Sequence, residues 1–312
     1  MALSHAAKEA TPLKERIYNS IWGLGARTMH MGKRLGISGP FERVLEQMAT
    51  RLMSTPSKEV EVSIGDDMKL VIPPGFPRAR TYLAGRYEPE VTALFRDTVK
   101  RGMSVVDIGA FCGYYAVLSS RLAGPSGRVY AFEVDPGNHK YLVRNLEANG
   151  CANVVPVNKA VFRSTGRMSM AFHAEADHHW VSDTEAGPAS TTVETVSLDD
   201  FFAAEGWPSV GLVKMDIEGG ELAALEGMRE LVRRNPDLKI IMEYDLENLR
   251  RAGASRESLG AVLQELGFSQ GYVIEQGMKP FRVPDGLPRT RATYDLLLRS
   301  GATSTSVPGT AA

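Results

Sequence analysis

From residue 103 onward, short apolar runs typical of buried strands alternate with longer segments of helical pattern. Strands are predicted at 103–109, 128–134, 153–161, 211–217 and 238–244, and helices at 112–123, 137–148, 220–233 and 255–266. Such alternation is typical of a mostly parallel sheet with helices on both faces. Two further strands in succession, 271–276 and 293–299, predict a final antiparallel pair. The chain is therefore predicted to be an α/β protein with seven strands.

Other segments extend this pattern. Residues 163–200 contain no clear crossover helix and predict a hairpin insertion beside the carboxyl edge of the sheet, where insertions often shape a substrate site. Residues 58–72 predict a leading hairpin, so that one domain spans 58–300. Residues 1–57 predict an N-terminal helical arm, packed on the main domain or forming a homodimer, or else touching a membrane or a substrate carrier. Residues 301–312 predict a flexible tail.

Composition narrows the class of partner and the compartment. The net charge of the 312 residues is -1, so no overall field favours nucleic acid or an anionic membrane. No apolar stretch approaches the roughly 18 residues that suggest a transmembrane segment, and the N-terminus lacks the apolar core of a signal peptide. The two cysteines, Cys112 and Cys151, have no metal-ligand spacing. A cytoplasmic protein without a nucleic-acid partner is expected.

The turn after the first strand of the alternating region carries the first functional signal. A dinucleotide-binding turn has the pattern G-x-G-x-x-G directly after this strand. Here the stretch reads DIGAFCG, with Asp107 in the first glycine's place, followed by Gly109, Ala110 and Gly113. A carboxylate repels a pyrophosphate and suits a positively charged group such as an ammonium or a sulfonium. The pattern therefore argues against a nicotinamide-dependent oxidoreductase.

A second acid, Glu133, ends the next strand in the run YAFEVDP. This is the usual place for a carboxylate that accepts hydrogen bonds from two ribose hydroxyls; the alternative is a solvated strand end. Together the two acids predict a ligand with a ribose and a cationic group but no phosphate. S-adenosyl-L-methionine meets this description, and its product would be S-adenosyl-L-homocysteine.

These residues also carry a family resemblance. Over residues 82–299 the chain resembles the FkbM family of S-adenosylmethionine-dependent methyltransferases, which mostly methylate hydroxyl oxygens. The blocks are RYEPEVTALF, VVDIGAFCGYYAVLSSRLAGPSGRVYAFEVDP, NLEANGCANVVPVNKAV and VSLDDFF…VGLVKMDIEGGELAALEGM…IIMEY. The run K-x-D-x-E-G-x-E in the last block is the most specific, since it is unusual among methyltransferases. The resemblance implies a Rossmann-like, seven-stranded sheet. The chain departs from the family at Phe111 and Val134, where the family usually has Asn and Pro.

The motifs and the resemblance together assign a set of cofactor-binding residues: Glu88, Asp107, Gly109, Ala110, Gly113, Glu133, Ala160 and Asp216. Alternatives exist for several of them. The small residues could serve tight packing alone, and Glu88 could simply favour a helix dipole. Asp135 and Asn138 could cap the following helix.

Methyl transfer to an alcohol needs a group that removes the hydroxyl proton. Candidates are Asp216 and Glu218 in the stretch DIEG, at the carboxyl edge of the sheet, and a histidine of the insertion, His173 first and then His178 or His179. Glu221 is predicted to be a helix N-terminal acid. Asp216, Glu218 and Glu243 form an incomplete ligand set for a divalent cation, so no metal site is predicted.

The sequence thus predicts an S-adenosylmethionine-dependent O-methyltransferase whose acceptor is a small molecule or saccharide, such as a glycan, glycolipid or polyketide hydroxyl. Two alternatives stay open. One is methylation of a nitrogen in protein or nucleic acid, although the signature N/D-P-P-Y/F is absent where DIEG stands. The other is a methyltransferase-like fold that serves as a non-catalytic scaffold.

Overall fold

The structure, a computed structural model, describes residues 58–64, 68–76, 78–83, 87–172, 179–181, 190–290 and 292–300. The predicted N-terminal arm and the predicted tail lie outside these ranges, and so does the homodimer contact that the arm would make. Within the described ranges no helix has the length and apolar character that a membrane span requires.

The larger sheet of the described chain has eight strands in the order β13-β12-β14-β11-β10-β3-β4-β5. The five strands from β11 to β5 are parallel, and β14, β12 and β13 pair antiparallel. Their bounds are β3 Ser104–Ile108, β4 Arg128–Phe132, β5 Val154–Val157, β10 Leu212–Met215, β11 Lys239–Tyr244, β12 Phe268–Val273, β13 Lys279–Arg282 and β14 Tyr294–Ser300. The α/β class is confirmed, but the count of seven strands is wrong. The added strand, β13, is largely exposed and lacks the apolar alternation that would reveal it.

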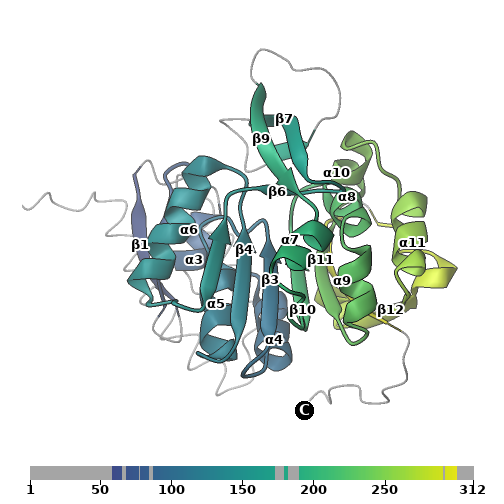
Figure 1. Cartoon of the computed structure of the whole chain (residues 1–312), viewed down its shortest axis with the longest axis horizontal. Helices are drawn as coiled ribbons and strands as arrows, with labels where there is room; N and C mark the ends of the chain where they lie inside the picture. Colours follow the sequence, from purple (N-terminus) through teal and green to yellow (C-terminus); the bar gives the residue numbers. More distant parts are fainter. Residues whose placement is uncertain are drawn as a thin grey trace, which may run out of the picture.

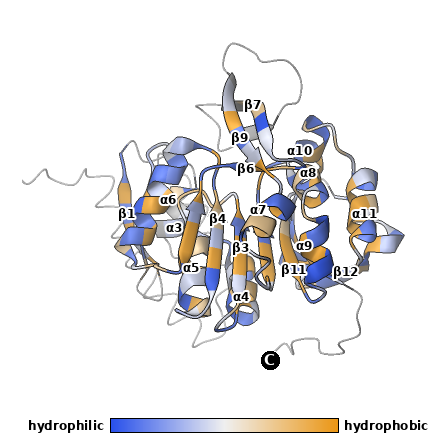
Figure 2. Ribbon diagram, viewed as in Figure 1, coloured by the Kyte–Doolittle hydropathy of each residue, from blue (hydrophilic) through white to orange (hydrophobic). Residues whose placement is uncertain are grey.

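Helices cover both faces of this sheet (Figure 1). One face packs against α3 Ala79–Leu83, α4 Pro89–Thr98, α5 Tyr114–Ala123 and α6 Pro136–Ala148. The other packs against α7 Leu198–Ala204, α8 Glu221–Glu226, α9 Arg229–Arg234, α10 Leu246–Arg251 and α11 Arg256–Glu265. Successive side chains of a strand point to opposite faces of the sheet, so each strand contributes to both cores. Val105, for example, belongs to the first core and Val106 to the second. The inner strands are accordingly mostly apolar (Figure 2), with Asp107 and Lys214 as buried exceptions.

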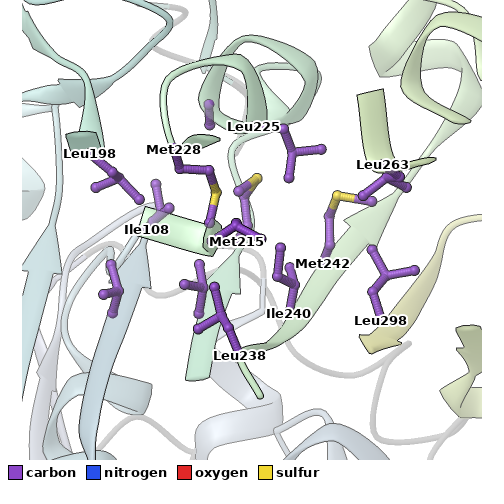
Figure 3. Close-up of a cluster of buried hydrophobic side chains, with 14 of the residues drawn as sticks. Ile108, Leu198, Met215, Leu225, Met228, Leu238, Ile240, Met242, Leu263 and Leu298 are labelled. Atoms are coloured by element: carbon purple, nitrogen blue, oxygen red, sulfur yellow. The ribbon is translucent and has the colours of Figure 1, made fainter. Parts of the chain in front are cut away.

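The second core shows how strands and helices share one apolar layer. In Figure 3 the side chain of Met215, from β10, points toward Met228 of the helical layer, and that of Met242, from β11, points toward Leu263 of α11. All four are fully buried. Burial of such side chains is the main stabilising contribution to the fold, at about 1.5–3 kcal/mol each.

Two predicted elements are divided in the structure. The predicted strand 153–161 separates into β5 and a short strand β6, Ala160–Val161, which belongs to a smaller sheet. The predicted helix 220–233 separates into α8 and α9 around Gly227. There the chain passes so close to the carbonyl of Phe162 that a Cβ on Gly227 would stand 2.2 Å from its oxygen. Neither division is visible in the local sequence pattern, because each depends on a segment that is distant in the sequence.

The predicted insertion builds the smaller sheet, with the strand order β6-β9-β7-β8. Its other strands are β7 Gly166–Phe172, β8 His179–Val181 and β9 Ser190–Val196. β7 pairs antiparallel with both β8 and β9, while β6 runs parallel to β9. In Figure 1 the strands β7 and β9 stand beyond the end of the larger sheet, and β6 lies between that end and these two strands. The insertion therefore borders the edge at which β3, β4 and β10 end.

The leading hairpin pairs β1 Val60–Ile64 with β2 Met68–Ile72. Two asparagines, Asn145 of α6 and Asn149 at its C-cap, fasten it to the domain by binding backbone groups of β2. The side-chain oxygen of Asn145 accepts from Val71 N at 2.7 Å, and its amide donates to the Val71 carbonyl at 3.0 Å and the Cys112 carbonyl at 2.7 Å. Asn149 binds N and O of Lys69 in the same way. These bonds place the chain after β2 beside the loop that follows β3.

Candidate active site

A cavity of about 360 Å³ lies where β3, β4 and β10 end. Its wall comes from five main segments of the chain, which are 73–76, 107–111, 132–135, 159–161 and 216–218. Of the residues predicted to bind the cofactor, Asp107, Gly109, Ala110, Glu133, Ala160 and Asp216 line it. Glu88 and Gly113 are not among the described residues that form the wall. The topology therefore gathers most of the predicted site in one place.

Asp107 is the cavity residue whose hydrogen-bonding capacity is least satisfied. Its side chain is 1% exposed, and neither carboxylate oxygen has a hydrogen-bond partner among the described residues. Burial raises the pKa of this carboxyl from 3.8 to about 6, although the nearby ammonium of Lys214 acts in the opposite direction. A buried polar group without a partner is costly. The carboxylate is thus suited to a positively charged hydrogen-bond donor in the cavity.

Glu133 follows β4 and is held rigidly by backbone groups. Its Oε2 accepts from Phe111 N and its Oε1 from Asp135 N, both at 2.8 Å. Burial raises the pKa of Glu133 from 4.5 to about 7, with these two hydrogen bonds opposing the shift. Each carboxylate oxygen has more than one lone-pair site, so both can accept a further hydrogen bond from a ligand. Asp135 also caps α6 by accepting from Asn138 N, the alternative considered for these two residues.

Phe111 has a left-handed backbone with φ of 48°. Asn tolerates this conformation better than other non-glycine residues, which explains why the related family usually has Asn there. The Phe111 ring packs on Phe76, with the ring centroids 4.5 Å apart. The departure from the family pattern therefore closes the cavity wall on the hairpin side, while the backbone N–H that binds Glu133 is kept.

The two glycines of the loop after β3 have different surroundings. Gly109 has φ of 82°, and a Cβ on it would stand 2.0 Å from the carbonyl oxygen of Asp216. The loop after β3 and the turn after β10 are therefore in direct backbone contact. Gly113 begins α5 with φ of 97°, and a Cβ there would meet Leu142 at 2.9 Å. Gly113 therefore serves the packing of α5 on α6, the alternative considered for the small residues.

The turn after β10 presents Asp216 and Glu218 to the cavity. Asp216 Oδ2 lies 3.1 Å from Lys214 Nζ, and Glu218 has a left-handed backbone with φ of 52°. Glu221 is the first residue of α8, as predicted, and its carboxylate accepts from Ile217 N and Gly219 N at 3.3 and 2.9 Å. Burial raises the pKa of Glu221 to about 7. The two hydrogen bonds that Glu221 accepts thus fix the backbone of the turn, which holds Asp216 and Glu218 in defined positions.

Lys214 lines the cavity although the sequence assigned it no role. It is 2% exposed, and its Nζ lies 4.7 Å from the centroid of the Tyr115 ring. Burial alone would lower the pKa of Lys214. The negative charges of Asp216, Glu88 and Asp107 together raise it by more, so the net shift is upward. Lys214 is therefore a buried cation at the centre of an acidic site.

Glu88 reaches the site indirectly. Its Oε2 accepts from the Tyr115 hydroxyl at 2.7 Å, and its Oε1 lies 3.8 Å from Arg78 Nη1. Tyr115 and Arg78 do line the cavity, together with Tyr82, Tyr87 and Tyr114. The tyrosine rings pack on one another, for example Tyr82 on Tyr87 with centroids 4.2 Å apart. This aromatic wall has no regular spacing in the sequence, so no local pattern could reveal it.

The remaining candidates are placed as follows. Ala160 lines the cavity, but from β6 of the smaller sheet and not from the end of the third strand of the larger one. His173 and His178 lie outside the described residues, and His179 lies in β8. In the described ranges no group of three or more His, Cys, Asp or Glu side chains could hold a metal ion. Glu243 faces Asp295 across β11 and β14, and burial raises the pKa of both carboxyls well above the ordinary range.

The model of the methyltransferase FkbM domain matches residues 107–274, more than half of the chain. The chain belongs to the FkbM methyltransferase family. The methyl donor of this family is S-adenosylmethionine. The matched region contains every described cavity segment except the hairpin side, from residue 73 to residue 87.

Curated relatives of this FkbM protein have different acceptors in their names. The chain is 30% identical over 145 residues to hexuronic acid methyltransferase AglP of Haloferax volcanii. The aligned region covers 46% of this chain and 57% of that protein. It is 28% identical over 153 residues to protein-L-isoaspartate O-methyltransferase of Aeropyrum pernix, which covers 47% and 50%. The chain therefore spans about half the length of these relatives.

Solved structures with a similar arrangement are methyltransferases of low sequence identity. Precorrin-6Y C5,15-methyltransferase of Geobacter metallireducens is 17% identical with a TM-score of 0.38, covering 68% of this chain and 87% of that chain. A SAM-dependent methyltransferase of Aquifex aeolicus is also 17% identical, with a TM-score of 0.37 and coverage of 68% and 89%.

Proposed function

We propose that this FkbM protein transfers a methyl group from S-adenosylmethionine to a hydroxyl oxygen of a saccharide. The observation that carries the proposal is that the unpartnered carboxylate of Asp107 and the acidic turn of Asp216 and Glu218 open on the same cavity. A cationic donor and a hydroxyl acceptor would meet between them. The similarity to a hexuronic acid methyltransferase supports a sugar as the acceptor.

On the donor side, Asp107 accepts hydrogen bonds from the ammonium of the methionine portion, which relieves the cost of its burial. Glu133 accepts from the ribose hydroxyls with the lone pairs that its two backbone contacts leave available. The backbone at Gly109 and Ala110 borders the same portion of the cavity, and Ala160 borders the adenine. When bound, S-adenosylmethionine supplies a methyl carbon already activated by its sulfonium.

On the acceptor side, Asp216 and Glu218 orient the hydroxyl and accept its proton, because an unactivated alcohol is a poor nucleophile. Lys214 holds Asp216 in place through the 3.1 Å contact. The enzyme otherwise contributes alignment of oxygen and methyl carbon, which is the main demand of an in-line displacement.

Amide substitutions test these roles. Asp216→Asn and Glu218→Gln should each reduce turnover by a factor of about 10² to 10⁴, the usual contribution of a general base. Glu218→Gln should change the affinity for S-adenosylhomocysteine by less than about 3-fold, a margin of about 0.7 kcal/mol. Turnover assays and titration calorimetry on the full chain provide the two measurements. Unimpaired turnover in both variants would show that the turn has no catalytic role.

A second acceptor class is favoured by the similarity to protein-L-isoaspartate O-methyltransferases, whose acceptor is a protein carboxyl group. Labelled methyl transfer to a uronic-acid oligosaccharide and to an isoaspartyl peptide separates the two classes. Alkali then distinguishes the products, since a methyl ether is stable and a methyl ester releases methanol. An alkali-stable label on the sugar supports the proposal, whereas an alkali-labile label or a labelled peptide contradicts it. Absence of S-adenosylhomocysteine binding would indicate a scaffold.

A further inference from the structure

Two buried side chains of opposite charge stand next to each other at the centre of the sheet. Asp107 of β3 and Lys214 of β10 are partners in the parallel register, so their side chains point to the same face. Both are almost fully buried, and both line the cavity. Asp107 nevertheless accepts no hydrogen bond from Lys214 or from any other described residue. The two charges therefore flank the cavity and attract each other without a direct hydrogen bond between them.

Lys214 has donor capacity beyond its contact with Asp216. An ammonium has three N–H donors. One reaches Asp216 Oδ2 at 3.1 Å, and the Tyr115 ring lies 4.7 Å from Nζ. A buried ammonium on the cavity wall attracts an anion strongly, because the surroundings screen charge poorly. The site therefore offers an anion-binding group beside the cation-binding carboxylate of Asp107.

An α-amino acid carries an ammonium and a carboxylate on adjacent atoms, and the methionine portion of S-adenosylmethionine is such a group. We propose that Asp107 and Lys214 together bind this portion, with Lys214 as the residue that binds its carboxylate. The assignment rests on the proposed function. It gives Lys214 two roles, since the same ammonium orients Asp216 and receives the carboxylate of the cofactor.

Two other cations of the cavity wall are less suited to this role. The side chain of Arg78 is 44% exposed and lies beside Glu88, and that of Lys159 is 39% exposed and pairs with Glu194 at 3.2 Å. An ion pair in contact with water contributes little, because water competes for both charges. Lys214 is the cation that water reaches least.

The test compares two ligands on the full chain by titration calorimetry. S-adenosylhomocysteine carries the carboxylate, and its decarboxylated analogue, S-adenosyl-3-thiopropylamine, carries only the amine. The unmodified protein should bind the first about 10- to 150-fold more tightly, the range expected for a charged hydrogen bond. Lys214→Met keeps the length of the side chain and should remove most of this preference by weakening only the first ligand. Lys214→Arg keeps the charge and should retain a preference.

Arg78→Met and Lys159→Met are the matched controls. Each removes a cavity cation of the same sign, and each should change the two affinities by the same factor. The assignment is overturned if the unmodified protein binds both ligands equally, a result that needs no variant. It is also overturned if Arg78→Met removes the preference and Lys214→Met does not. Failure of the unmodified protein to bind either ligand would instead overturn the proposed function and this assignment with it.

Discussion

At the scale of single residues, Phe111 shows how a backbone requirement can be met by an unfavourable side chain. Its left-handed conformation lets its N–H reach Glu133 at 2.8 Å, and its ring packs on Phe76. The conformation costs about 1–2 kcal/mol for a residue other than Gly, Asn or Asp. An aromatic contact of this kind contributes about 0.5–1.5 kcal/mol. The strain and the contact are therefore of similar size and offset each other.

Phe111→Asn should consequently change the free energy of unfolding by less than about 1 kcal/mol, because it loses both terms together. Affinity for S-adenosylhomocysteine should stay within about 3-fold, or about 0.7 kcal/mol, since the N–H to Glu133 is preserved. Urea unfolding and calorimetry measure the two quantities. Phe111→Pro is the control, because it removes the N–H and excludes a positive φ; it should lose both stability and binding. A large loss of affinity in the Asn variant would mean that the ring itself contacts the ligand.

At the scale of elements, the leading hairpin is held by two side-chain amides, one in α6 and one at its C-cap. Asn145 is fully buried and binds three backbone groups, two on Val71 and one on Cys112. Asn149 makes the equivalent pair of bonds to Lys69 near the surface. The difference in burial predicts a difference in energy, because water can replace the partner of an exposed group but not of a buried one.

Asn145→Ala should therefore lower the free energy of unfolding by about 2–4 kcal/mol, as buried backbone groups lose their partners. Asn149→Ala, the matched control, should lower it by less than about 1 kcal/mol. Urea unfolding gives both values, and hydrogen exchange of the Val71 amide should accelerate only in the first variant. Equal losses in the two variants would contradict the role given to burial.

The same scale shows which elements the sequence reveals. The strands β3, β4, β10 and β11 are buried runs with turn signals on both sides, and the sequence predicts them closely. The exposed strand β13 and the break between α8 and α9 escape prediction. Their causes are pairing with a neighbouring strand and a close approach of Phe162, and neither leaves a local pattern.

At the scale of the whole molecule, buried carboxyls with a raised pKa make stability depend on pH. Burial raises the pKa of Glu133 and Glu221 to about 7 and that of Asp107 to about 6. The unfolded chain loses these protons near pH 4 to 4.5, so the folded protein binds more protons between about pH 4.5 and 7. Folding stability must then decrease as pH rises through this window.

The ligand-free protein should therefore be more stable at pH 5.5 than at pH 7.5. Each glutamate should account for a loss of at most about 2 kcal/mol between these two pH values, because only the part of the window from pH 5.5 to about 7 lies between them. Urea unfolding across this range measures the slope. Glu221→Gln should reduce the dependence of stability on pH, because it removes a carboxyl that binds a proton in the folded protein. Glu221 does not line the cavity, so the variant leaves the cavity wall unchanged. Stability that rises with pH in this window would contradict the shifts.

The site was predictable where its residues follow strands and unpredictable where they come from elsewhere. Asp107, Glu133 and Asp216 each follow or end a recognisable strand, and the edge of a parallel sheet brings them together. Arg78, Tyr87 and the segment 73–76 reach the cavity from outside the alternating region, beside a hairpin that Asn145 and Asn149 fasten to the domain. Lys214 opens the run K-x-D-x-E-G-x-E, but the run alone gives it no role, which becomes visible only with its burial beside Asp107.

The contact between Gly109 and the Asp216 carbonyl has a consequence for how such an enzyme can diversify. Because a Cβ on Gly109 would stand 2.0 Å from the Asp216 carbonyl oxygen, the loop after β3 and the turn after β10 cannot change position independently of each other. If Asp107 and Asp216 serve donor and acceptor as proposed, changes of acceptor should arise mainly in the insertion between β6 and α7, which contributes Met170 to the cavity wall. Swapping that insertion between relatives would transfer acceptor choice as a module, while grafting the DIEG turn alone would not.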